Sequence, residues 1–266
     1  MTVHAIDIDR YLARIGLASR PGPDIGGLRT LQVAHLHHVP FENLDILAGR
    51  PISIEIHALE AKVVGARRGG FCYELNGLFA ALLDALGFRV TRLAAEVWSR
   101  DQGTWGPPFD HLVLRVDLEG PWLVDVGFGD GFPEPMELRD GAELLDIGGR
   151  VFRLTREGDA WLLTELPAGA DARVPLYRFS GTPHDLADFT PTCRWQETES
   201  PFFTGHRVVE MAAPDGGTTL YDDRLIVHAG TERTERRVTE AEVPDLLRDV
   251  FGIEAPAGVS SPLARP

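Results

Sequence analysis

Hydrophobic residues in the first third of the chain recur at spacings of three and four, which is the repeat of amphipathic helices. Residues 7–17 and 54–64 show this pattern, and turns that contain proline and glycine lie between them. A third segment opens at Cys72 and carries a wide apolar stripe made of Leu75, Leu78, Phe79, Leu82, Leu83 and Leu86. Gly87 stands where a glycine commonly ends a helix. The pattern therefore predicts helices up to about Gly87.

The pattern changes to short alternating runs over residues 88–176, which predicts antiparallel strands. A stretch typical of loops, residues 180–192, comes next. Further alternating runs occupy residues 207–228 and predict more strands. One late helix is predicted to begin at a capping box formed by Thr239 and Glu242.

Composition places the 266-residue chain among globular proteins, with 44% hydrophobic and 25% charged residues. The net charge of −14 argues against nucleic acid or an anionic membrane as a partner, since both need clustered lysine and arginine. Lys62 is the only lysine, a bias we ascribe to genomic composition. No run approaches 18 apolar residues, so we expect no membrane span. Two cysteines and no secretory leader pattern favour a reducing, cytoplasmic setting.

Cys72 is the first candidate for chemistry because it lies at the predicted start of a helix. Unpaired backbone amides and the positive end of the helix dipole stabilise a thiolate there. Gly69 and Gly70 are expected to leave room for a substrate beside it. The alternative is that Cys72 is a small buried hydrophobic residue, as free cysteines often are.

A thiolate nucleophile needs a base, and the base needs an orienting acid. His111 opens a predicted strand, and Asp125 interrupts the apolar run that follows it. If residues 119–121 form the loop of a hairpin, Leu118 pairs with Trp122, and His111 and Asp125 project from the same side of the sheet. The alternatives are a strand-end histidine and a carboxylate that binds backbone amides.

Four motifs together resemble the arylamine N-acetyltransferases: RRGGFCYELNGLF at residues 67–79, HHVPFENLDIL at 37–47, HLVLRVDL at 111–118 and LVDVGFGD at 123–130. The similarity covers most of residues 5–130. It implies an α+β fold with a helical bundle at residues 1–87, an antiparallel β-barrel at 88–190 and an α/β lid with a C-terminal helix at 191–266. The bundle would supply the nucleophile of a Cys-His-Asp site between bundle and barrel, and the barrel the other two residues.

The resemblance also implies a reaction with Cys72, His111 and Asp125 as catalytic triad. Acetyl-CoA, a co-substrate rather than a tightly bound cofactor, would acetylate Cys72, and an aromatic amine or hydrazine would then attack the thioester. Two alternatives share the triad: an amide synthase that uses a polyketide acyl thioester in an ansamycin-type pathway, and a cysteine hydrolase or transglutaminase-like enzyme. The oligomeric state is left open.

The family's acceptor pocket would include Phe41 and Phe128, and Phe202 is a looser correspondence. Gly127 and Gly129 would shape the backbone beside the thioester. Arg68 is expected to pair with Glu42.

Two positions depart from the family pattern. Asp110 stands where threonine is common, and Glu96 stands where arginine is common. The extra negative charge of Asp110 beside the base is expected to disfavour an anionic acceptor.

A cluster of three histidines, His35, His37 and His38, raises the question of a metal site. On a helix His35 and His38 share a face while His37 is rotated away, and no cysteine or acid at matching spacing completes a ligand set. We therefore expect no metal.

Overall fold

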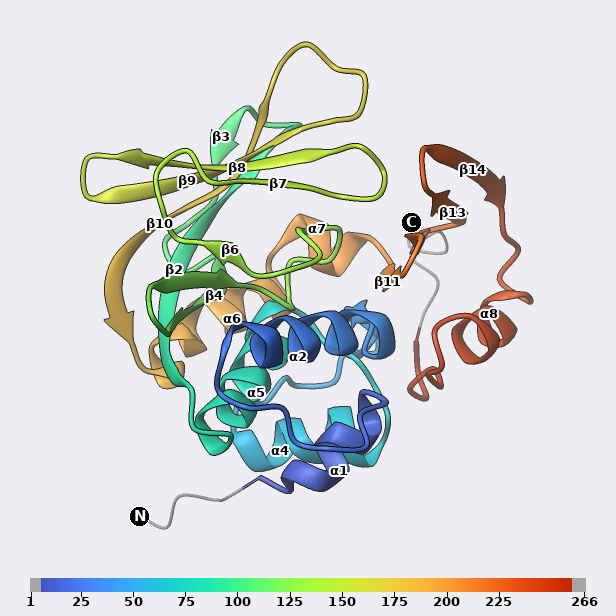
Figure 1. The fold of residues 1–266 in the computed structure, drawn as a ribbon. Coiled ribbons are helices and arrows are strands. Elements are labelled where there is room, and N and C mark those ends of the chain that lie inside the picture. The colour runs from blue at the N-terminus through green and yellow to red at the C-terminus, as the bar shows by residue number, and fades with distance from the viewer. Residues whose placement is uncertain (1–5, 260–266) are drawn as a thin grey trace.

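The computed structural model describes residues 6–259 and has an α+β architecture of two antiparallel sheets with helices packed against them (Figure 1). The helices of the first third are α1 (Ile8–Arg14), α2 (Ile25–His38), α3 (Leu44–Leu47), α4 (Ile56–Glu60), which continues as a π-helical turn over Ala61–Gly65, and α5 (Cys72–Ala85). Together they confirm the predicted helical region. No helix among the described residues is long and apolar enough to cross a membrane.

Helix α5 is the central element of the helical part. Its apolar stripe is buried in one core cluster with residues of α1, α2 and strand β4. The helix ends as predicted, because Gly87 adopts the left-handed conformation with φ +89° directly after the cap residue Leu86. Since α5 packs against the larger sheet, its first residue lies between helices and strands.

The larger sheet is fully antiparallel, with strands in the order β6-β5-β4-β2-β10-β9-β8-β7 and β3 paired to β2. Its strands are β2 (Arg89–Ser99), β3 (Thr104–Trp105), β4 (His111–Asp117), β5 (Pro121–Val124), β6 (Met136–Glu137), β7 (Glu143–Leu145), β8 (Val151–Glu157), β9 (Ala160–Leu166) and β10 (Val174–His184). The sheet curls around its own core cluster, in which Phe152, Leu163 and Tyr177 are buried.

The β4–β5 hairpin has a register two residues from the expected one. Val116, not Leu118, lies opposite Trp122. Leu118 instead belongs to the turn, where its amide donates to the Gly120 carbonyl at 2.9 Å. Because side chains alternate with a period of two, a two-residue shift keeps every side chain on its expected face. His111 and Asp125 therefore remain on the same side of the sheet.

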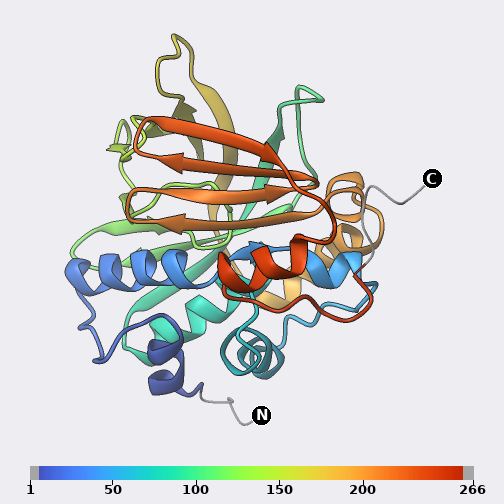
Figure 2. The same ribbon diagram turned by 90° about the vertical axis from the view of Figure 1, so that its right-hand side faces the viewer.

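The second sheet has the order β1-β11-β12-β13-β14 and lies beside α2 (Figure 2). Its strands are β1 (Phe41–Glu42), β11 (Val208–Ala213), β12 (Gly216–Tyr221), β13 (Arg224–Ala229) and β14 (Glu232–Arg237). A 3₁₀ turn over Leu186–Phe189, α6 (Thr190–Thr198) and α7 (Pro201–Gly205) connect the sheets, and α8 (Val243–Asp249) follows. Strand β1 joins this sheet across a long sequence separation, since Phe41 pairs with Glu210.

The late helix begins later than the capping box predicts. Glu242 accepts hydrogen bonds from the amide and hydroxyl of Thr239, both at 2.8 Å, but α8 starts only at Val243. These bonds lower the pKa of Glu242 to about 2. The predicted contact thus forms, and it closes a turn that precedes the helix.

Candidate active site

Cys72 is the first residue of α5, and its side chain is only 4% exposed. Glu74 fixes this helix start, because its Oε2 accepts the Phe71 amide at 3.1 Å. The two preceding glycines do not leave space for a substrate as the sequence suggested. A Cβ on Gly69 would lie 2.0 Å from the Pro40 carbonyl oxygen, and one on Gly70 would lie 2.6 Å from the Glu74 carboxylate. Both glycines therefore permit close packing within the protein.

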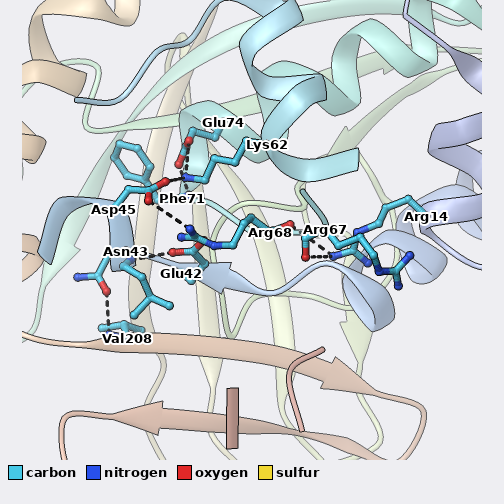
Figure 3. A network of polar contacts seen from close by, with 11 residues as sticks. Arg14, Glu42, Asn43, Asp45, Lys62, Arg67, Arg68, Phe71, Glu74 and Val208 are labelled. Carbon is cyan, nitrogen blue, oxygen red and sulfur yellow. Dashed lines mark hydrogen bonds and ion pairs between the residues drawn. The ribbon is translucent and has the colours of Figure 1, made fainter. Parts of the chain in front are cut away.

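Buried ion pairs hold the segment before Cys72 in place (Figure 3). Arg68 donates to Glu42 Oε1 through Nε at 3.0 Å and Nη2 at 2.6 Å, which confirms the predicted pair. Lys62 Nζ lies 2.7 Å from both Asp45 Oδ2 and Glu74 Oε1. Since Glu74 also binds the helix start, this network connects four separate segments around the candidate nucleophile.

His111 and Asp125 meet as the hairpin argument predicts. Nε2 of His111 lies 2.7 Å from Oδ2 of Asp125, and both residues are buried. A proton on Nε2 leaves Nδ1 as the nitrogen able to act as a base. The geometry thus joins a base to its orienting acid.

Asn76, which the sequence analysis did not single out, completes this pair. One turn after Cys72 on α5, its Nδ2 donates to Asp125 Oδ1 at 2.8 Å and to the Leu112 carbonyl at 2.7 Å. Its Oδ1 accepts the Val126 amide at 2.9 Å. A fully buried amide thereby ties the nucleophile's helix to the strands that carry His111 and Asp125. An asparagine in an otherwise apolar helix stripe was the signal available in the sequence.

Cys72 lies beside the His111 strand, with Sγ 4.0 Å from the Asp110 carbonyl oxygen. Burial raises the pKa of its thiol well above the usual value, and the Asp110 and Asp125 charges act in the same direction. A hydrogen bond with the Leu112 backbone opposes this rise. Because this desolvation outweighs a helix dipole worth about 1 kcal/mol, the helix terminus alone does not ionise Cys72, in keeping with the base that the sequence argument already required. A thiolate here requires a nearby imidazolium.

The loop after β5 places two predicted pocket residues against the site. Gly127 passes so close to α5 that a Cβ on it would lie 2.8 Å from the Cys72 Cα. The Phe128 ring contacts the His111 ring edge-on, with 5.3 Å between centroids. Phe128 also lines a cavity of about 340 Å³, whose other lining residues are Trp98, Arg100, Asp130, Glu165, Pro175, Leu176 and Glu210.

Comparison with known proteins shows which family has this sequence and fold. The N-acetyltransferase family model matches residues 24–258. The arylamine N-acetyltransferase of Mycolicibacterium smegmatis is 38% identical over 94% of this chain and 93% of its own length. The chain belongs to the arylamine N-acetyltransferase family. The fold agrees, since the solved M. smegmatis enzyme superposes with a TM-score of 0.87 at 37% identity, covering 94% of this chain and 93% of that one.

A second solved member of the arylamine N-acetyltransferase family is the Mycobacterium marinum enzyme in complex with CoA. It has a TM-score of 0.85 at 34% identity and covers 93% of each chain. All these relatives are named arylamine N-acetyltransferases, and none is named an amide synthase or a hydrolase. The two alternatives weighed from the sequence therefore receive no support.

The three phenylalanines expected in the family's acceptor pocket lie in different surroundings. Phe41 is buried at the start of β1, whereas Phe202 on α7 is 45% exposed and contacts His206 and Tyr221. The neighbouring Phe203 is the α7 residue that faces inward, with ring contacts to Phe41 at 6.3 Å and to Phe71 at 5.4 Å.

The two positions that depart from the family pattern are both engaged in the fold. Glu96 pairs with Arg178 across strands β2 and β10. The Asp110 carboxylate accepts hydrogen bonds from the Gln196 side chain and from the Val97 amide. Burial raises the pKa of Asp110 to about 6.

The histidine cluster is part of the core and the helix surface. His35 is fully buried, its Nδ1 lies 3.0 Å from the Tyr11 hydroxyl, and burial lowers its pKa to about 3. His38 Nδ1 bonds to the Ala34 carbonyl within α2. Among residues 6–259 no three histidine, cysteine or acidic side chains are grouped to hold a metal.

Proposed function

We propose that this protein transfers an acetyl group from acetyl-CoA to an aromatic amine or hydrazine through a thioester on Cys72. The observation that carries the proposal is the contact between His111 Nε2 and Asp125 Oδ2 at 2.7 Å, on a strand that Cys72 Sγ approaches at the Asp110 carbonyl. The family to which the chain belongs supports the same chemistry. Acetyl-CoA is a substrate of this reaction, and the CoA complex of the M. marinum relative supports that choice. We propose the cytoplasm as its setting, since the chemistry needs a reduced thiol.

In the first half-reaction His111 takes the Cys72 proton, and the resulting thiolate attacks the acetyl carbonyl carbon. The imidazolium supplies the nearby positive charge that the buried sulfur needs, and Asp125 stabilises it. The bond between the acetyl carbon and the CoA sulfur breaks, and the CoA sulfur leaves as the thiol with the proton from His111. The Cys72 amide, in the first turn of α5, is suited to bind the carbonyl oxygen during attack.

In the second half-reaction the acceptor nitrogen attacks the thioester, and His111 accepts the proton that the nitrogen loses. The C–S bond to Cys72 breaks, and the acetylated amine leaves. Because CoA departs before the acceptor reacts, the kinetics are ping-pong. Phe41, Phe128, Gly127 and Gly129 would shape the acceptor site, with Phe203 a better placed α7 contributor than Phe202.

Mass spectrometry of the intact protein and its peptides tests the proposal. With acetyl-CoA and no amine, the protein should gain one acetyl group on Cys72, and added aniline should discharge it. Cys193, a second buried free thiol on α6, offers the matched control. Cys193→Ser should load like the parent, and Cys72→Ser should not load. No adduct from acetyl-CoA, combined with loading from a larger acyl thioester, would favour the amide synthase instead.

A further inference from the structure

One carboxyl group in the cavity beside Phe128 lacks a cationic partner. Glu210, on β11, lines this cavity. Two guanidinium groups nearby are paired with other acids. Arg100 pairs with Glu165 at 3.2 Å, and Arg150 pairs with Asp130 at 2.8 Å. Among residues 6–259 no ion pair includes Glu210, so the group is available to a cationic ligand when it is ionised.

The Glu210 carboxyl group is held in a defined orientation. The Thr219 hydroxyl on β12 donates to Oε1 at 2.8 Å. Its Oε2 lies against Gly129, where a Cβ would stand only 2.3 Å away. Gly129 has φ +83°, a conformation that favours glycine, so this close approach is built into the loop. Phe41 is the cross-strand partner of Glu210.

The same loop connects Glu210 to the candidate nucleophile. Gly127 packs against the Cys72 Cα, and Gly129 packs against the Glu210 carboxyl group. The Cα atoms of these glycines are at most about 7 Å apart, because they are two residues apart in the chain. Phe128 lies between them and faces both His111 and the cavity. An aromatic acceptor seated on Phe128 would thus have Cys72 on the Gly127 side and Glu210 on the Gly129 side.

We propose that Glu210 is a specificity-determining residue that favours aromatic amines or hydrazines with a cationic group at the far end of the ring. This inference rests on the proposed acetyl transfer and adds the acceptor's chemical class. A guanidinium or amidinium group suits the site because it donates two parallel hydrogen bonds to one carboxylate.

The protonation of Glu210 gives the preference a pH dependence. Burial and the neighbouring Asp130 charge raise its pKa to about 8, while hydrogen bonds from the Thr219 hydroxyl and the Asp130 backbone, together with the Arg150 charge, act to lower it. Below that pH the group holds a proton and attracts a cation less. The advantage of a cationic acceptor over a neutral one should therefore grow as the pH rises through about 8.

Steady-state kinetics of Glu210→Gln test the proposal with three acceptors of one shape: 4-methylaniline, 4-aminobenzamidine and 4-aminobenzoate. Above about pH 8, where Glu210 is ionised, kcat/KM of the parent should be highest for the amidine. In the variant, the ratio of the amidine to the methyl compound should fall about tenfold, the value of a charge-assisted hydrogen bond. The ratio of kcat/KM for the benzoate to that for the methyl compound should rise. Thr219→Val, which frees the carboxyl group, should lower the amidine ratio in the same direction.

Glu137→Gln is the matched control, because Glu137 lies on β6 outside the cavity lining and pairs with the exposed Arg139. It should leave all three ratios unchanged. Equal changes for all three acceptors in Glu210→Gln, or none, would overturn the proposed selectivity. Failure of the transfer reaction itself is separately visible, since Cys72 of the parent would then not load from acetyl-CoA before any acceptor is added.

Discussion

Asn76 offers the sharpest test of how the site is held together. Asn76→Ala removes three hydrogen bonds, two donated by Nδ2 at 2.7 and 2.8 Å and one accepted by Oδ1 at 2.9 Å. All three partner groups stay buried after the change. At about 1 kcal/mol per bond, the free energy of unfolding should fall by about 3 kcal/mol. Because Asp125 Oδ1 keeps only the Gly127 amide, the His111 ring also loses part of its support.

Asn76→Ala should also slow the chemistry of the folded protein, which a loss of stability alone would not do. A carboxylate that orients the base less firmly should slow Cys72 acetylation by about tenfold to a hundredfold. Urea unfolding gives the stability, and quenched mass spectrometry with acetyl-CoA gives the single-turnover loading rate. The loading rate is measured at a temperature where the variant is fully folded.

Asn43 provides a closely matched control. It is also buried and makes three hydrogen bonds, to the Phe203 and His206 carbonyls and from the Val208 amide. Asn43→Ala should cost similar stability and leave the loading rate near that of the parent. Equal slowing in Asn43→Ala and Asn76→Ala would refute the idea that Asn76 acts through the His111–Asp125 pair.

Three further outcomes are expected. Asp125→Asn should lower kcat/KM by at least about a hundredfold while circular dichroism stays unchanged, because the amide favours the wrong imidazole tautomer; near-normal turnover would exclude Asp125 as the orienting acid. Lys62→Met should lower the unfolding free energy by about 3 kcal/mol or more, since it leaves the Glu74 carboxylate buried without its cation while Asp45 keeps only Arg68; an unchanged urea midpoint would contradict this. His35, with a folded pKa of about 3 against an ordinary 6.5, binds its proton more readily when unfolded, so stability should fall as the pH drops from about 6.5 toward 3. Urea midpoints across this window should show a shallower loss in His35→Gln, and parallel slopes would exclude His35 as the source.

Local patterns were enough to predict the elements that carry the candidate site. The apolar stripe of α5 predicted the helix, because a buried helix face repeats every three to four residues, and the glycine after the stripe predicted its end. The side shared by His111 and Asp125 followed from strand alternation, and it survived a two-residue error in register for the same reason. The motifs around these residues supplied the family.

Contacts between distant segments were not accessible in this way. Strand β1 has two residues, and its pairing with β11 depends on packing that no local pattern encodes. The strength with which burial opposes ionisation of Cys72 was not accessible either, because a helix start is visible in sequence whereas the depth of burial is not. Glu210 went unnoticed for a related reason, since its strand brings it near the candidate site only through the folded sheet.

The position of Lys62 has a chemical consequence for a protein that handles activated acetyl groups. Its ε-amine is the only one in the sequence, and Asp45 and Glu74 enclose it as a charged ammonium. These contacts raise its pKa above the ordinary lysine value, so the neutral, nucleophilic amine is scarce. Acetyl-CoA should therefore leave no acetyl-lysine on the folded protein during turnover, and amine-directed labels and crosslinkers should find no lysine to react with until it unfolds.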